Sequence, residues 1–143
     1  MRFMFKMVVV AALLAPAAAV ADEASDKAAL ARQVVELSVA PGLDGRIARM
    51  VGEAAAKQPA DKQAQARTDF AKAATGPREE LIKVFSTYYA GAFSVAELKD
   101  LVAFYTSPLG RKAVKVENEK PAEVNAAIQQ QIMKIVGALG AGR

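Results

Sequence analysis

The sequence predicts an all-α fold, a single compact bundle of about six helices without disulfides. Alanine is abundant, runs of β-branched residues are short, and apolar residues recur at three- and four-residue steps. No stretch alternates convincingly between apolar and polar residues as a strand would. The 143-residue chain has no cysteine, so packing or oligomerisation must supply the stability that small secreted domains often take from disulfides.

The first 21 residues are typical of a secretory signal peptide. Arg2 and Lys6 flank a short positive start, residues 7–15 are apolar without a charge, and small residues precede Asp22. This run is shorter than the about 20 apolar residues that a spanning helix needs. We therefore expect cleavage between Ala21 and Asp22, a periplasmic mature protein and no stable membrane anchor.

The remainder, residues 22–143, is expected to form one helical domain, because no linker is long enough to separate two cores. A first helix is predicted from about 25 to 39, ended by Pro41-Gly42. A second helix starts near 43 or 44, and Pro59 closes it. Both carry one apolar stripe and are expected to face a core.

Residues 60–75 are expected to form a solvated helix, because Phe70 is the only large apolar residue there. Gly76 and Pro77 suit a helix end and a helix start respectively, which predicts a new helix from 77 to about 92. Its predicted buried stripe is Leu81, Phe85, Tyr88 and Ala92, widened by Ile82 and Tyr89.

The next boundary is the best specified in the chain. Ser94 and Glu97 have the spacing of a capping box, and Phe93 and Leu98 that of a hydrophobic staple. This helix should end before Ser107-Pro108, which can cap and begin another.

Residues 109–120 are expected at the surface, because they are basic at their start and hold few large apolar side chains. Pro121 either kinks this segment or begins a last helix. The stripe of that helix is the longest in the chain: Val124, Ile128, Ile132, Ile135 and Leu139.

Aromatic residues are concentrated in two consecutive predicted helices. Six of the seven that follow residue 21 lie between Phe85 and Tyr105. Core packing is their ordinary role. Neighbours on a helix point about 100° apart, however, so one residue of each adjacent aromatic pair should lie at the edge of the interface. The candidate ligand-binding or interface residues, including two basic residues without a local role, are Tyr88, Tyr89, Phe104, Tyr105, Arg111 and Lys112.

The run from Tyr89 to Lys112 has the order Phe93-Ser94-x-x-Glu97-Leu98 followed by Phe104-Tyr105-x-Ser107-Pro108-x-Gly110-x-Lys112. It resembles the secreted bacterial family named domain of unknown function 2059, and the match covers about residues 77–121. The resemblance implies an all-helical exported domain with a periplasmic address in Gram-negative bacteria. It implies no activity, substrate or catalytic residue.

The composition excludes several kinds of chemistry. Without histidine or cysteine the chain cannot build a thiolate or imidazole zinc site, a haem site with those ligands, or a Ser-His-Asp or Cys-His centre. No stretch matches a calcium-binding loop. We therefore expect no metal, no cofactor and no catalytic residue.

The charges favour no nucleic-acid partner. Arg2 and Lys6 supply two of the 19 basic residues, so the part after residue 21 is almost balanced against 15 acidic residues, and its charges are interspersed.

The sequence favours an exported, non-enzymatic helical binding or interaction protein, whose partner is an unknown protein or small molecule. A periplasmic hydrolase that uses paired carboxylates is the alternative, since such groups can act as general acid and base without histidine. Association with a membrane surface through residues 111–120 is less favoured, because Glu117 and Glu119 reduce the charge there. Homo-oligomerisation stays open.

Overall fold

The computed structural model describes residues 16–140, which form six α-helices and one short 3-10 helix and contain no strand. The all-α class and the six helices are therefore confirmed. The helices are α1 (Pro16–Ser38), α2 (Ala40–Ala56), α3 (Gln63–Ala92), α4 (Val95–Thr106), α5 (Pro108–Asn118) and α6 (Ala122–Gly140), with η1 (Ala60–Lys62) between α2 and α3. The start of the expected signal peptide, residues 1–15, lies outside the described residues.

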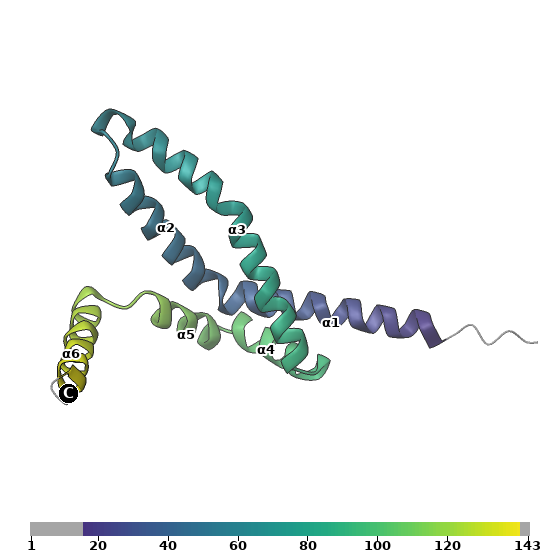
Figure 1. The fold of residues 1–143 in the computed structure, drawn as a ribbon. Coiled ribbons are helices and arrows are strands. Elements are labelled where there is room, and N and C mark those ends of the chain that lie inside the picture. Colours follow the sequence, from purple (N-terminus) through teal and green to yellow (C-terminus); the bar gives the residue numbers. More distant parts are fainter. Residues whose placement is uncertain (1–15, 141–143) are drawn as a thin grey trace, which may run out of the picture.

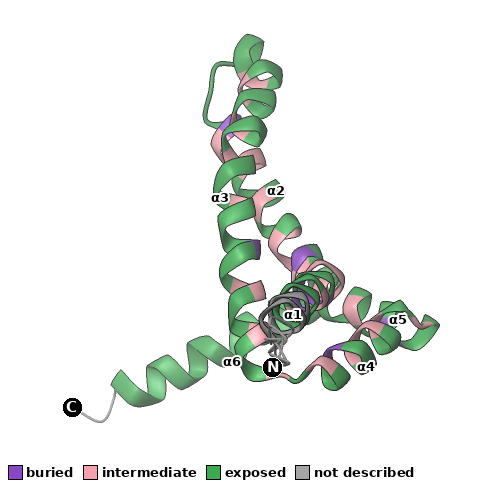
Figure 2. Cartoon of the chain, turned by 90° about the vertical axis from the view of Figure 1, so that its right-hand side faces the viewer, coloured by how far each residue is buried: buried purple, intermediate pink, exposed green. Residues whose placement is uncertain are grey.

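The helices are arranged around α1 (Figure 1). Helices α2 and α3 run side by side as an antiparallel arm that extends from α1, with η1 at its far end. Helix α4 packs against α1 on another side, α5 continues from α4, and α6 projects at the end of the chain (Figures 1 and 2).

Two small apolar clusters join α1 to α2, α3 and α4. In one, Ala31 and Val34 of α1 pack with Leu98 of α4. In the other, Val35 of α1 packs with Ala40 of α2 and with Ile82 of α3. Tyr89 packs against both clusters, so it joins the two parts of the core.

Several helix boundaries differ from those predicted. Helix α1 already includes Pro16, the first described residue, instead of starting near Ser25, because alanine-rich residues of high helix propensity precede the acidic segment. Pro41 does not stop a helix. It lies in the first turn of α2, where a missing N–H costs nothing, and Val39 alone separates α1 from α2.

The predicted break at Gly76-Pro77 is wrong, because α3 continues through Pro77 without interruption. Gly76 does not adopt the positive φ of a helix end. Helix α2 contacts α3 on both sides of the proline, through Ala71 and Ala74 before it and through Arg78 after it. Tertiary packing therefore offsets the cost of the proline within the helix.

The buried face of α3 also differs from the predicted stripe. Ile82 is fully buried and Phe85 and Tyr89 pack beside it, whereas Leu81 and Tyr88 are 42% and 69% exposed. The centre of the buried face is thus rotated by about 60° about the helix axis from the centre of the predicted stripe.

The predicted start of α4 is confirmed. The Ser94 hydroxyl accepts a hydrogen bond from the Glu97 amide at 3.3 Å, and the Ser94 amide donates to the Glu97 carboxylate at 2.8 Å. Leu98 is fully buried, and Phe93 packs against its cluster. Ser107 and Pro108 start α5 as predicted, with the Ser107 hydroxyl accepting from the Gly110 amide at 3.0 Å.

Replacing Ser94 with alanine should lower the free energy of unfolding by about 1 kcal/mol, because the early amides of α4 lose their side-chain acceptor. Urea denaturation followed by circular dichroism measures the change. Ser94→Asn keeps an acceptor at the same position and should retain most of the stability. Equal losses in the two variants would contradict the capping role.

Candidate functional site

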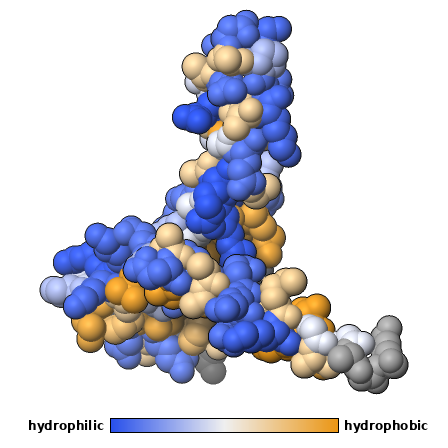
Figure 3. Space-filling model, turned by 90° about the vertical axis from the view of Figure 1, so that its left-hand side faces the viewer, coloured by the Kyte–Doolittle hydropathy of each residue, from blue (hydrophilic) through white to orange (hydrophobic). Residues whose placement is uncertain are grey.

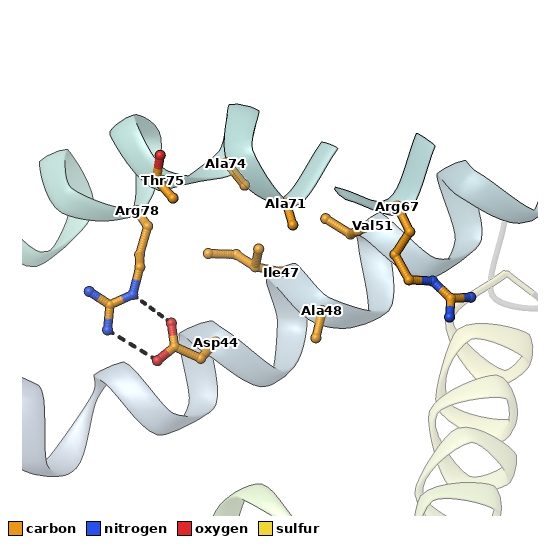
Figure 4. A pocket seen from close by; sticks show the side chains of 9 residues that line it. All are labelled: Asp44, Ile47, Ala48, Val51, Arg67, Ala71, Ala74, Thr75 and Arg78. Atoms are coloured by element: carbon orange, nitrogen blue, oxygen red, sulfur yellow. Dashed lines mark hydrogen bonds and ion pairs between the residues drawn. The ribbon is translucent and has the colours of Figure 1, made fainter. Parts of the chain in front are cut away.

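A cleft between α2 and α3 is the main candidate site (Figure 4). It encloses about 320 Å³ and lies along the arm rather than against α1. Ile47, Ala48 and Val51 of α2 form one wall, and Ala71 and Ala74 of α3 form the other. The residues at its ends are Asp44, Arg67, Thr75 and Arg78.

The cleft exists because its walls combine helical spacing with small side chains. Ile47 and Val51 are four residues apart on α2, and Ala71 and Ala74 are three apart on α3, so each pair lies on one helical face. The alanines do not reach across the space between the two helices. The result is an apolar groove that stays open to solvent.

One end of the cleft is closed by an ion pair. The Arg78 guanidinium donates to both carboxylate oxygens of Asp44, from Nε at 2.7 Å and from Nη2 at 3.1 Å, as the dashed lines in Figure 4 show. Arg78 Nη2 also donates to Glu36 of α1 at 3.3 Å. Such bidentate geometry fixes the guanidinium firmly and leaves its charge compensated.

A second arginine extends this network across the helices. Arg32 of α1 pairs with Glu79 of α3 at 2.6 Å and with Glu36 at 3.3 Å. The hydrogen bond from Arg78 lowers the pKa of Asp44, and the hydrogen bond from Arg32 lowers that of Glu79. The same contacts raise the pKa of both arginines. All four groups are thus held in their charged forms at neutral pH.

These pKa shifts predict acid sensitivity. A carboxyl whose pKa is lowered by folding contributes stability above its unfolded pKa of about 4, and this stability is lost as the pH falls through the folded pKa. Glu97, whose pKa is lowered by hydrogen bonds from Ser94, acts in the same direction. The melting temperature should therefore fall as the pH is lowered from about 5 towards 2.

Asp44→Asn should lower the melting temperature at neutral pH and flatten this acid decline, because the titrating partner of Arg78 is gone. Glu80→Gln is the control, since Glu80 forms no ion pair with the described residues. Melting curves between pH 2 and 7 measure both. A wild-type protein with a constant melting temperature over this range would contradict the role of the network.

The other end of the cleft carries Arg67, an exposed residue that makes no ion pair with any described residue. In Figure 4 its side chain lies at the end opposite Arg78. The cleft therefore has an apolar middle, one neutralised end and one cationic end.

The six residues singled out from the sequence lie away from this cleft. Tyr88 is 69% exposed, while Tyr89 packs on the core with its ring centroid 5.5 Å from that of Phe93. Phe104 is 42% exposed, and Tyr105 packs on the core. One member of each adjacent pair thus lies at an edge, as predicted.

The two aromatic pairs do not border a common groove. Their rings make edge contacts within each pair, at 6.1 Å for Tyr88 and Tyr89 and at 5.1 Å for Phe104 and Tyr105. Phe104 and Tyr105 line a hollow of about 330 Å³ between α4 and α5, together with Ala113 and Val114. Tyr88 and Tyr89 do not line that hollow.

Arg111 and Lys112 are exposed on the first turns of α5. Arg111 donates a hydrogen bond to the Thr106 carbonyl at the end of α4. That contact gives Arg111 a local structural role, because a cation near a helix C-terminus satisfies a free carbonyl. Neither residue lines the α2–α3 cleft.

The cleft was not predicted from the sequence because a helix end was expected at Gly76, between the cleft residues Ala74 and Arg78. The signal was nonetheless present: Arg67, Ala71, Ala74 and Arg78 recur at helical spacing across the supposed break.

Among the described residues we find neither a cluster of potential metal ligands nor a candidate membrane-spanning helix. Within residues 16–140, no group of three or more acidic side chains is placed to hold a metal ion. No helix in this part of the chain is long and apolar enough to cross a bilayer.

Neither the curated proteins nor the solved structures contain a match to this chain. Residues 79–137 match a family described as "Uncharacterized protein conserved in bacteria (DUF2059)". This segment runs from the second half of α3 through most of α6 and begins just after the last residue of the cleft. The resemblance to domain of unknown function 2059 is thereby confirmed over residues 79–137.

Proposed function

We propose that this chain is an exported, non-enzymatic binding protein that holds an elongated apolar ligand with an anionic end in the α2–α3 cleft. The observation that carries the proposal is the cleft's pattern of an apolar middle and an uncompensated arginine at one end. Pockets of small-molecule sites combine apolar walls with a few placed polar groups in the same way, and 320 Å³ is at the lower end of their range of about 300–1,000 Å³.

The two arginines determine how the ligand is oriented. Arg78 is already paired with Asp44 and Glu36, so an anion placed there would meet two carboxylates. Arg67 offers a guanidinium without such competition, and a guanidinium binds a carboxylate or phosphate with two hydrogen bonds. The anionic group therefore lies at Arg67, and the apolar part extends along Ile47, Val51 and Ala74.

The alternative of a carboxylate-dependent hydrolase gains no support from the site. A general acid needs a carboxyl whose pKa is raised towards neutrality, by burial or by a second carboxylate. No charged residue is buried among those whose burial the structure describes, residues 23–140. Asp44, Glu79 and Glu97 have lowered pKa values, which favours the ionised form.

Export to the periplasm is part of the proposal and rests on the N-terminal sequence. Cleavage between Ala21 and Asp22 would cut within α1, yet the buried residues described for that helix begin at Ala31. The remaining helix would start with Asp22 and Glu23, which interact favourably with a helix N-terminus. Intact-mass measurement of the exported protein tests this, and a mature form that still begins at Met1 would refute it.

Binding of decanoate and of decanol, measured by calorimetry below their aggregation limits, tests the cleft. The two probes share a ten-carbon chain and differ in the anionic group, so the wild-type protein should prefer decanoate. Arg67→Gln should remove most of that preference while leaving decanol binding nearly unchanged. Ala74→Leu fills the cleft and should weaken binding of both probes at least tenfold.

Ala73→Leu is the matched control, because Ala73 is an exposed neighbour on α3 that does not line the cleft. It should bind both probes like the wild type. Failure of the wild type to bind either probe, or equal binding by the Ala73→Leu and Ala74→Leu variants, would overturn the proposal.

A further inference from the structure

A polar pocket of about 720 Å³ lies on the side of α2 that faces away from the α2–α3 cleft. Arg46 and Arg49 line this pocket, and they follow Asp44 and Ile47 of the cleft by two residues each. Two residues correspond to a rotation of about 200° on a helix, so the arginines point away from the cleft. Figure 3 views the molecule from the side on which α6 lies, where hydrophilic residues predominate along the arm.

The opposite wall of the pocket is formed by the end of α5 and the start of α6. Asn118 reaches α2 at Gly42, where a Cβ atom would overlap the Asn118 Oδ1 atom. Asn118 Nδ2 donates to the Val114 carbonyl at 2.8 Å, and Asn125 of α6 donates to the Lys120 carbonyl at 3.0 Å. The end of α5 thus lies against α2, and a hydrogen bond joins it to α6.

Arg46 and Arg49 are exposed cations without a carboxylate partner among the described residues. They are three residues apart, so they are neighbours on one helical face, where like charges destabilise a helix. Glu53, one turn beyond Arg49, neither lines the pocket nor pairs with a described residue. A base that precedes an acid is also the weaker order for such a pair. An anion between the two guanidinium groups would therefore relieve their repulsion.

The acidic residues of the pocket do not neutralise these arginines. Glu117 pairs with Lys120 at 2.9 Å, and Glu119 pairs with Lys115 at 3.8 Å. Their carboxylates can still accept hydrogen bonds from hydroxyl groups, and the Gln129 amide offers a donor and an acceptor. No leucine, isoleucine, valine, methionine or aromatic residue of the described chain lines this pocket. It therefore suits a polar ligand rather than an apolar one.

We propose that this pocket binds a small hydroxylated anion, such as a sugar phosphate or a sugar acid, with the anionic group between Arg46 and Arg49. A guanidinium binds phosphate or carboxylate through paired hydrogen bonds, and the polar groups of the opposite wall bind hydroxyl groups. The volume of about 720 Å³ is within the range of about 300–1,000 Å³ for small-molecule sites. The pocket and the cleft lie on opposite sides of α2, so this proposal does not rest on the function proposed above.

Amide NMR spectra of the isotope-labelled protein, recorded during titration with four probes, test the proposal. Glucose 6-phosphate and glucuronate carry hydroxyl groups and an anionic group, whereas glucose lacks the anion and inorganic phosphate lacks the hydroxylated ring. The first two probes should shift the amide signals of Arg46, Arg49 and Gln129 saturably. They should bind at least tenfold more tightly than glucose or inorganic phosphate.

Removal of the two arginines tests their role. The double variant Arg46→Gln/Arg49→Gln should bind glucose 6-phosphate and glucuronate at least tenfold more weakly than the wild type. The double variant Lys72→Gln/Lys83→Gln is the matched control, because it removes two positive charges from exposed positions of α3 that do not line the pocket. It should bind both probes like the wild type.

Obstruction of the pocket tests its location without changing the charge. Gly45 lines the pocket, and nothing lies within 4 Å of the position of a Cβ atom there. Gly45→Leu should therefore weaken binding of both anions at least tenfold without lowering the melting temperature, because leucine favours a helix more than glycine does. Gly52→Leu is the control, since Gly52 is equally open on the same helix but does not line the pocket.

The proposal is wrong if glucose 6-phosphate causes no saturable shifts, as would follow if the arginines pair with Glu117 or Glu119 in solution. It is also wrong if inorganic phosphate binds as tightly as glucose 6-phosphate, because the hydroxylated ring then contributes nothing. Equal binding by the arginine and lysine double variants, or by Gly45→Leu and Gly52→Leu, would likewise overturn it.

Discussion

Replacing Ile82 with alanine is expected to lower the free energy of unfolding by about 2–5 kcal/mol, a large fraction of the roughly 5–15 kcal/mol available to a protein of this size. Ile82 is fully buried where three helices meet, in a cluster with Val35 of α1 and Ala40 of α2. Truncation removes apolar contacts and leaves a cavity that these helices can fill only by moving.

Urea denaturation followed by far-ultraviolet circular dichroism measures this loss. Val84→Ala is the control, because Val84 lies two residues away on the same helix but is 62% exposed. It should change stability by less than about 0.5 kcal/mol. Similar losses for the two variants would show that the face of α3 described here is not the one that packs.

Replacing Gly110 with alanine is expected to destabilise the protein by about 1–3 kcal/mol or more, because the site has no room for a methyl group. A Cβ atom there would overlap the Phe104 carbonyl oxygen and lie 2.8 Å from the Tyr105 Cα. Both are backbone atoms, so relief requires α4 and α5 to separate rather than a side chain to rotate.

Gly52→Ala, in contrast, is expected to raise the free energy of unfolding. Gly52 lies inside α2 with nothing within 4 Å of the position of a Cβ atom, and glycine lowers helix stability there by roughly 0.5–1 kcal/mol relative to alanine. Melting temperatures of the two variants should therefore move in opposite directions. An equal or more stable Gly110→Ala variant would contradict the close approach of α4 and α5.

The features predicted well from the sequence are those whose causes are local. The start of α4 depends on Ser94 and Glu97, which are three residues apart, and the start of α5 depends on Ser107 and its neighbour Pro108. In each case side-chain and backbone groups of one turn determine the boundary, so the sequence contains the whole explanation.

The features predicted badly depend on distant parts of the chain. Gly76 and Pro77 have the local chemistry of a break, yet α2 packs along α3 on both sides of them and keeps the helix whole. Likewise, whether Ile82 or Leu81 is buried depends on where α1 and α2 lie, because both residues suit an apolar stripe.

The α2–α3 cleft also depends on distant parts of the chain, and its residues do not stand out in the sequence. The aromatic pairs do stand out, so they were predicted as site residues instead. The walls of the cleft come from two helices, and its alanines are inconspicuous in an alanine-rich chain. Arg67 and Arg78 differ in role only because Asp44 and Glu36 are placed beside one of them.

Pro77 also divides α3 thermodynamically. It has no amide hydrogen, so the Ala73 carbonyl lacks its usual donor within the helix, and the hydrogen-bond ladder is interrupted within the α3 wall of the cleft, on the tip side of Ile82. Local opening of the part of the α2–α3 arm beyond Pro77, towards η1, therefore breaks fewer hydrogen bonds than opening of an uninterrupted helix. It leaves the contacts of Ile82 and Leu98 in place. Widening of the cleft by this route would leave both core clusters intact, so the ligand proposed above need not be limited to the resting volume of about 320 Å³.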